Sequence, residues 1–506
     1  MPSRWPGSSS GSARSSAIDR ASARRESSQT IEQLRERYGE RYKWLVLLTV
    51  MIGTMASIMA STIVNVAIPD LSRFFSLDQA QAQWVSAGFM LAVTLSMLLT
   101  PWLLQRFGLR RTYTWVVIVL SVGALIGGLA QAYWLVLSMR VVEGLAAGIL
   151  QPIPSIIILR AFAPAQQGKA MGVFGFGVVL APAIGPSIGG LLVELYGWRS
   201  IFFVMIPFGI AALTLARRYL PWAAISSEKR PLDWKGLALI CLATVSLLNG
   251  VTRLSPADRP VGPCLLALSA GALAGFIWLQ RRSSAPLMNL KPFAYRQFAV
   301  GSLVALIYGM GLFGSTYLLP IYLQLALEYG PARAGLVLLP AGLVLAVVIP
   351  LAGRLADRFP THWLVSGGLL VLAASFGLMA TVGAGTAYLV LVVWVVVGRI
   401  GLGFVLPALG LGAMRGLAMD LIAQGSSTIN FARQLGGALG VSLTGILLDW
   451  RLHAHGVGLS SANGGPVGER VKAFDETFLA VAALCACAAF AATQMTPRKR
   501  AASAGA

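Results

Sequence analysis

The chain has 506 residues, of which 56% are hydrophobic and only 12% are charged, and its mean hydropathy is +0.73. Soluble proteins carry about 25% charged residues, so this composition excludes a soluble globular protein and indicates that lipid surrounds most of the chain. The formal net charge of +21 would suit a nucleic-acid-binding protein. However, the basic residues lie in short loops between apolar runs, so we expect the lipid bilayer, and not nucleic acid, as the partner.

The chain begins with a Ser- and Arg-rich tail, residues 1–43, which lacks the apolar core of a cleavable signal peptide. We expect this tail to be largely disordered, with a short amphipathic helix on the membrane surface from about Ile31. After it, apolar runs of about 20 residues recur, which is the length that crosses the hydrocarbon core. We predict fourteen transmembrane helices, at residues 44–66, 83–104, 112–131, 134–158, 170–194, 199–219, 235–253, 263–280, 298–320, 332–353, 363–383, 386–411, 426–448 and 477–495.

The loops between these spans set the predicted orientation. Fourteen spans put both termini on one side, and that side carries 29 Lys and Arg residues against 8 on the other. Loops rich in Lys and Arg stay in the cytoplasm. We therefore expect a multi-pass protein with both termini cytoplasmic.

Two parts of the sequence repeat weakly. The fourth span contains the run Arg140-Val-Val-Glu-Gly144, and the twelfth contains Arg399-Ile-Gly-Leu-Gly403. A basic turn follows the second span, and its repeat follows the tenth, two spans later than two six-helix halves alone would place it. Repeated halves are typical of transporters, so we predict an all-α membrane fold of two six-helix halves with two inserted helices. The predicted division is an N-terminal tail at 1–43, the first half at 44–219, the inserted helices at 220–296, the second half at 297–495 and a C-terminal tail at 496–506.

The fifth span contains the run Ala181-Pro182-Ala-Ile-Gly185-Pro186-Ser-Ile-Gly189-Gly190. The glycines form a small face for close helix contact, and the prolines remove backbone donors and bend the helix. Such a helix suits a contact on which two halves rock. The run resembles the antiporter motif of exporters in the major facilitator superfamily. The motif residues are Pro182, Gly185, Pro186, Gly189 and Gly190.

Further runs extend this resemblance. Thr62-Ile-Val-Asn65-Val-Ala-Ile-Pro69 lies in the first span, and Arg433-Gln434-Leu-Gly436-Gly437-Ala-Leu-Gly440 lies in the thirteenth. From about Trp44 to Met495 the chain is similar to the fourteen-span drug:proton antiporters of the superfamily. The resemblance implies a secondary active transporter of the inner membrane. Such a protein exports small amphipathic or drug-like compounds by proton antiport with alternating access.

Enzymatic activity is not expected. The sequence contains no phosphate-binding Gly-rich loop, no nucleophile with a neighbouring base and no converging metal ligands. We expect no cofactor, with the proton gradient as the energy source, and a small molecule as the substrate. A periplasmic adaptor protein is compatible with the sequence.

The cytoplasmic turns after the second and tenth spans carry the predicted gate. The acidic residue that the resembled family usually has in the first turn is Gln105 here, whereas the second turn retains Asp357. We therefore expect the two halves to be held asymmetrically. The predicted gating residues are Gln105, Arg106, Gly108, Gly353, Asp357, Arg358 and, from the thirteenth span, Arg433.

Charged residues inside the membrane are costly and usually functional. Glu143 is the only acidic residue away from the ends of the predicted spans, and Arg140 lies three residues before it on the same helix face. The resembled family usually has Asp at the position of Ala60, which that family uses in proton coupling or cation binding. We predict that Glu143 carries the proton and that Arg140 governs its release. The alternative is a static ion pair.

Polar groups elsewhere in the spans are candidates for the substrate pocket, although each has an alternative role in hydrogen bonding between helices. They are Asn65, Gln151, Arg399, Asn430 and Gln434. The absence of the first-span Asp and the surplus of intramembrane Arg favour an alternative function, in which the protein exports or facilitates the passage of an endogenous anionic metabolite.

Overall fold

The computed structural model describes residues 31–221, 231–254, 260–383, 385–456 and 467–496. These residues form helices and connecting turns, with no β-strand among them. The prediction of an all-helical protein is therefore confirmed. The α-helices are α2 (Ile31–Tyr38), α3 (Tyr42–Phe75), α4 (Gln79–Ser96), α5 (Thr100–Leu129), α6 (Tyr133–Leu150), α7 (Ile153–Ala161), α8 (Pro164–Tyr196), α9 (Ser200–Phe203), α10 (Met205–Tyr219), α11 (Trp234–Thr252), α12 (Val261–Arg282), α13 (Arg296–Ile321), α14 (Pro331–Arg358), α15 (Thr361–Met379), α16 (Tyr388–Met414), α17 (Ile422–Ala454) and α18 (Val467–Ala492).

Twelve helices of the described residues are long and apolar enough to cross a membrane. One of them, Gln81–Leu129, has 49 residues, whereas about 20 suffice for one crossing. It is interrupted within α5 at Gly108, whose φ of 75° is non-helical. The first crossing therefore comprises α4 and the start of α5, and the second comprises the rest of α5. Dividing this helix and adding the 33-residue α8 gives fourteen. The criterion of length and composition alone gives twelve, so the count of fourteen stays a prediction.

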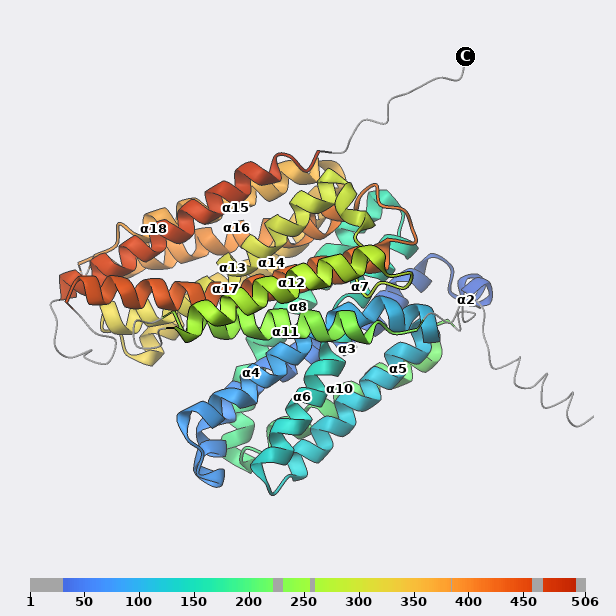
Figure 1. Ribbon diagram of the computed structural model, residues 1–506, viewed down its shortest axis with the longest axis horizontal. Helices are drawn as coiled ribbons and strands as arrows, with labels where there is room; N and C mark the ends of the chain where they lie inside the picture. The colour runs from blue at the N-terminus through green and yellow to red at the C-terminus, as the bar shows by residue number, and fades with distance from the viewer. Residues whose placement is uncertain (1–30, 222–230, 255–259, 384, 457–466, 497–506) are drawn as a thin grey trace, which may run out of the picture.

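The helices form two bundles. Figure 1 shows α3 to α6 and α10 in one bundle and α13 and α15 to α18 in the other. Helices α8 and α14, one from each half, pack against each other between them. Glycines allow such close packing, as at the contact of α13 with α17, where a side chain on Gly436 would collide with the carbonyl oxygen of Leu306.

The inserted pair, α11 and α12, packs mainly on itself. The Ser269 hydroxyl donates a hydrogen bond of 2.8 Å to the carbonyl oxygen of Ala243, which joins the two helices. Ile240 and Phe276 of the pair form one buried cluster with Leu98 beside α4 and Phe431 on α17. The pair therefore covers the seam where the first half meets the second.

The N-terminal tail is described only from Ile31 onward. The predicted short helix is present as α2, whose Leu34 is buried against the protein. The predicted disorder of residues 1–30 lies outside the described residues, as does the tail at 497–506.

The run that resembles the antiporter motif lies in α8. Gly185 and Gly189 pack against Thr62 and Ile63 of α3, within the same half. The face of α8 that contacts the other half lies nearer its amino-terminal end, where Gly172 meets Pro350 of α14. The expected contact between the halves is therefore present on α8, but these motif glycines do not make it.

Candidate functional site

Arg140 and Glu143 form a buried ion pair in α6. Each side chain is 1% exposed, and Nη1 of Arg140 lies 2.6 Å from Oε2 of Glu143. The guanidinium also donates to the carbonyl oxygen of Ala60 on α3, at 3.1 Å, and stacks 4.0 Å from the ring centre of Phe89 on α4. The pair therefore holds together the helices α3, α4 and α6 of the first half.

The carboxylate is only half satisfied. Oε1 of Glu143 is buried and has no hydrogen-bond partner among the described residues. Such an orphaned oxygen is costly in a purely structural ion pair, which would be expected to satisfy both carboxylate oxygens. It leaves an acceptor that is free to take a proton.

The position of Ala60 explains how this site differs from that of the resembled family. Arg140 reaches the backbone of residue 60, where an Asp side chain would otherwise stand close to the guanidinium. Here the counter-charge comes instead from Glu143, one turn along the helix that carries Arg140 itself. The sequence identified the pair, but the contact of Arg140 with residue 60 requires the packing of α6 on α3.

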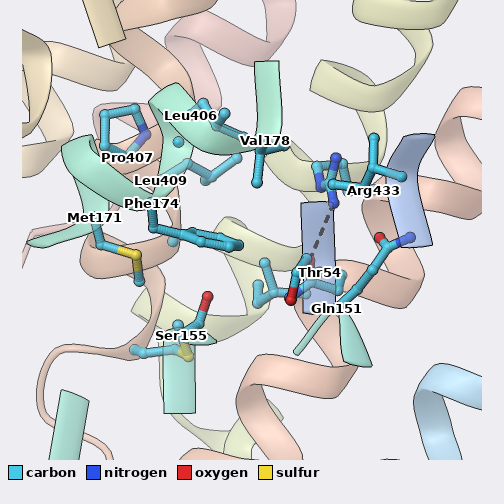
Figure 2. Close-up of a pocket in the computed structure, with 16 residues that line it drawn as sticks. Thr54, Gln151, Ser155, Met171, Phe174, Val178, Leu406, Pro407, Leu409 and Arg433 are labelled. Carbon is cyan, nitrogen blue, oxygen red and sulfur yellow. Dashed lines mark hydrogen bonds between the residues drawn. The ribbon is translucent and has the colours of Figure 1, made fainter. Parts of the chain in front are cut away.

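A small cavity of about 70 Å³ lies between the halves. Its wall includes residues of α3, α7 and α8 from the first half and of α16 and α17 from the second. Figure 2 shows Phe174 of α8 and Arg433 of α17 extending towards the same central space, with Ser155 and Gln151 nearby. A mostly apolar wall with a few polar groups is typical of a site for a small organic molecule.

Two of the five predicted pocket residues, Gln151 and Asn430, line this cavity. Asn65 lies elsewhere and accepts a hydrogen bond of 2.7 Å from Ser86, which joins α3 to α4. Gln434 contacts the Met90 sulfur at 3.5 Å, across the two halves. Arg399 borders a separate small space inside the second half.

Arg433, predicted as a gating residue, also lines the cavity, where it donates to Oδ1 of Asn430 at 3.1 Å. Its gating role stays a prediction. Most of the apolar wall, including Met171, Val178 and Leu406, was missed from the sequence. Such residues carry no signal of their own, because an apolar side chain in a span has the same appearance whether it faces lipid, protein or a cavity.

The second-half turn joins the two halves at the end of the molecule that is predicted to be cytoplasmic. The Asp357 carboxylate accepts hydrogen bonds from the backbone nitrogens of Gly168 and Lys169 on α8, at 2.6 Å and 2.8 Å. Gly353, one turn earlier on α14, lies against the backbone of Gly168 and Gly172, where no side chain would fit. Arg358 ends α14 at the same edge.

The first-half turn is built differently. Gly108 adopts a positive φ of 75°, a conformation that favours glycine, and reverses the chain between the two crossings. Gln105 and Gly108 border a second cavity of about 490 Å³, together with Lys43 and Arg160. Arg106 lies in the same turn. Only the second-half turn therefore presents a carboxylate to the opposite half, in line with the expected asymmetry.

The sequence profile of the Major Facilitator Superfamily matches residues 50–441. A multidrug resistance protein B homolog of Mycobacterium tuberculosis is 33% identical over 400 residues, covering 78% of this chain and 74% of that one. The multidrug export protein EmrB of Escherichia coli is 28% identical over 388 residues, covering 76% of each chain.

Among solved structures, the proton:xylose symporter XylE has the same fold, with a TM-score of 0.63 over 90% of this chain and 95% of that one. Its sequence is only 13% identical, so the likeness concerns the fold alone. The match of the family profile extends over most of the chain and ends within α17 of the second half. The chain therefore belongs to the major facilitator superfamily, as a transporter of the multidrug efflux type and not an enzyme.

Proposed function

We propose that the protein exports small amphipathic organic compounds across a bacterial inner membrane, in exchange for protons. Support comes from relatives that are named for multidrug resistance or export. The cavity between the halves has a mostly apolar wall with a few polar groups, which is the chemistry that such a compound requires. No nucleotide-binding motif is present in the sequence, which leaves the proton gradient as the energy source.

The observation that carries the proton coupling is the Arg140–Glu143 pair. Its carboxylate is the only acidic group in the middle of the helices of the first half, and one of its oxygens has no partner among the described residues. A proton on Glu143 removes the negative charge that balances Arg140. The guanidinium then lacks a counter-charge in a low-dielectric site, which destabilises this packing of α3, α4 and α6. Proton binding therefore favours a rearrangement of the first half.

Alternating access is supported by where the halves meet. Among the described residues, the hydrogen bonds between the halves include those of Asp357 and the bond of 3.1 Å from Ser426 to the carbonyl oxygen of Pro152, both towards the cytoplasmic ends. Figure 1 shows the opposite ends of the two bundles pointing away from each other. This conformation corresponds to a transporter closed to the cytoplasm.

The proposal is tested with purified protein in liposomes under an imposed pH gradient. Amphipathic dyes of positive, neutral and negative charge are offered, and dye flux and internal pH are followed together. We expect at least one class of dye to move against its gradient while protons move in the opposite direction. Proton antiport would be contradicted if the flux of every dye were independent of the pH gradient.

Glu143→Gln keeps the size of the side chain and removes the charge. We expect it to bind dye but to lose proton-coupled flux at least tenfold. Glu194→Gln makes the same change at an exposed position near the end of α8 and should leave flux unchanged. Coupling that survives in Glu143→Gln would remove this residue from the mechanism.

A further inference from the structure

The second half holds positive charge deep in the membrane without any nearby negative charge. Arg399 lies on α16 and Arg433 on α17, whereas α13, α15 and α16 contain no acidic residue. The carboxylates of this half lie in loops, near the ends of helices or in the first third of α18, at Glu328, Asp357, Asp420, Asp449, Glu469, Asp475 and Glu476. None of these carboxylates, all within the described residues, forms an ion pair with Arg399 or Arg433.

Both arginines lie too deep to be ordinary interfacial residues. Each stands eleven residues from the start of its helix, at Tyr388 for Arg399 and at Ile422 for Arg433. At about 1.5 Å per residue this is about 16 Å, or roughly half of a hydrocarbon core about 30 Å thick. Neither charge therefore lies at an end of its helix, where a long side chain reaches water easily.

Neither arginine has an ion pair among the residues that the structure describes. Arg433 donates to the neutral amide oxygen of Asn430 at 3.1 Å. Arg399 borders a small space beside Ser315 and Ser375, which are also neutral. Arg140 of the first half differs, because Glu143 supplies its counter-charge. The uncompensated charge therefore belongs to the second half, and Arg433 brings it to the wall of the central cavity.

We propose that the exported compounds carry an anionic group that binds to Arg433 in this cavity. This inference rests on the proposed function, since it takes the cavity between the halves as the transport site. The apolar part of the compound lies against Phe174, Met171 and Leu406 on the opposite wall. Arg433 makes the direct contact, and Arg399 strengthens the positive potential of the half without touching the compound.

The cost of an unpaired charge in the membrane explains why the ligand needs this group. A guanidinium held within a membrane-spanning helix is unfavourable unless it is paired or hydrated. A carboxylate or sulfonate removes that penalty through a charge-assisted hydrogen bond. A cationic compound adds a second positive charge beside Arg433, so it is disfavoured at the same position.

Three dansyl compounds that share one aromatic body test the charge preference. Dansylglycine carries a carboxylate, dansylglycinamide is neutral, and a dansyl compound ending in trimethylammonium is cationic. Their binding to the purified protein in lipid nanodiscs is measured by fluorescence. A hydrogen bond to a charged group changes affinity by about tenfold or more, so we expect the carboxylate to bind at least tenfold more tightly than the other two.

The variants separate direct contact from long-range potential. Arg433→Gln should remove the preference for the carboxylate, and Arg433→Lys should retain most of it. Arg399→Gln should weaken it by a smaller factor. Arg451→Gln, at the exposed end of α17, is the matched control and should leave binding unchanged. Monodisperse elution and an unchanged melting temperature of Arg433→Lys establish that position 433 tolerates substitution.

Equal or tighter binding of the cationic compound would overturn the anionic preference, as would an Arg433→Gln variant that binds dansylglycine normally. Proton-coupled export of cationic dyes alone would overturn it too, and the proposed antiport would stand. Tight binding of dansylglycine without any proton-coupled flux would instead contradict the proposed antiport. The anion site would then stand, and proton antiport would fall.

Discussion

A nearby carboxylate stabilises a buried arginine, and that carboxylate can stand at different places in the sequence. Arg140 has one partner on its own helix, Glu143, and a second contact at the backbone of Ala60. The geometry at residue 60 leaves a side chain there close to the guanidinium. We therefore predict that an Asp side chain at position 60 can take over the role of counter-charge from Glu143.

The double variant Ala60→Asp/Glu143→Gln tests this prediction. Removing one partner of a buried ion pair costs about 3–5 kcal/mol, so Glu143→Gln alone should lower the melting temperature clearly. Adding Asp at 60 restores the counter-charge, and we expect it to recover at least half of that loss. Thermal unfolding of the two variants and of the wild type gives the comparison.

Ala60→Asp alone serves as the control for this cycle. It places two carboxylates around one guanidinium in a buried site, so it should destabilise the wild type while it stabilises Glu143→Gln. If Ala60→Asp lowered the melting temperature equally in the wild type and in Glu143→Gln, the new carboxylate would not reach Arg140.

For single residues, the sequence identified the buried charged side chains more successfully than it identified the polar side chains that face the cavity. Glu143 and Arg140 stood out because charged residues are rare in spans, and their spacing placed them on one face. Asn65 and Gln151 gave equal signals, yet only Gln151 faces the cavity. The direction in which a polar side chain points depends on how its helix is rotated against neighbours far away in sequence.

Where two helices pack with their backbones in close contact, the size of the side chain at the contact position is limited. Gly367 and Gly368 are neighbours on α15, but their surroundings differ. A side chain on Gly368 would lie 2.8 Å from the carbonyl oxygen of Gly401 on α16, whereas Gly367 has no heavy atom within 4 Å of that point. The two positions therefore form a matched pair for testing the contact of α15 with α16.

We expect Gly368→Ala to lower stability by about 1–3 kcal/mol, because overpacking forces the two helices apart. Gly367→Ala should be neutral or stabilising by up to about 1 kcal/mol, because alanine is the better helix former. Thermal unfolding in detergent compares the two variants directly. A similar loss in both would mean that α15 packs in a different rotation.

Hydropathy predicted where helices lie, since lipid imposes a length of about 20 apolar residues on each crossing. The turn at Gly108 was also foreseen from its basic residues. The face that each helix buries was not foreseen. The glycines of the antiporter motif were expected to join the halves, but Gly185 and Gly189 pack on α3. A glycine-rich run predicts that a helix packs closely, but it does not indicate which helix is the partner.

For the molecule as a whole, the predicted orientation follows from an even number of crossings in each half. The hydroxyl of Tyr42, at the start of α3, donates a hydrogen bond of 3.2 Å to the carbonyl oxygen of Tyr219, at the end of α10. The guanidinium of Arg296, at the start of α13, donates a hydrogen bond of 2.9 Å to the side-chain oxygen of Gln494, which follows α18. Each half therefore begins and ends on one side. The excess of basic residues there predicts that this side faces the cytoplasm.

Reporter fusions test this orientation in cells. Green fluorescent protein fused to either terminus should fluoresce, and alkaline phosphatase at either terminus should be inactive. Alkaline phosphatase fused after Gly197, in the turn between α8 and α9, should be active. Termini on opposite sides would mean an odd number of crossings and would place the basic turns outside the cytoplasm.

The balance between the two conformations depends on a gate that only the second half holds with a carboxylate. Asp357 accepts two backbone hydrogen bonds from α8. Asparagine at this position has no charge, and its amide nitrogen cannot accept a hydrogen bond. Losing about 1.4 kcal/mol shifts a two-state equilibrium tenfold, and one hydrogen bond to a charged group contributes at least that much. Asp357→Asn should therefore shift the protein towards the state that is open to the cytoplasm.

Spin labels at Ala165 on α8 and Arg354 on α14 report this shift as a distance, in a background from which the four cysteines have been removed. We expect a single short distance for the parent protein and a substantial longer population for Asp357→Asn. Asp420→Asn, in an exposed loop of the same cytoplasmic side, should keep the parent distribution. If Asp357→Asn also kept it, the backbone contact at Gly353 would suffice to close the gate, and the asymmetry between the two turns would have no role in it.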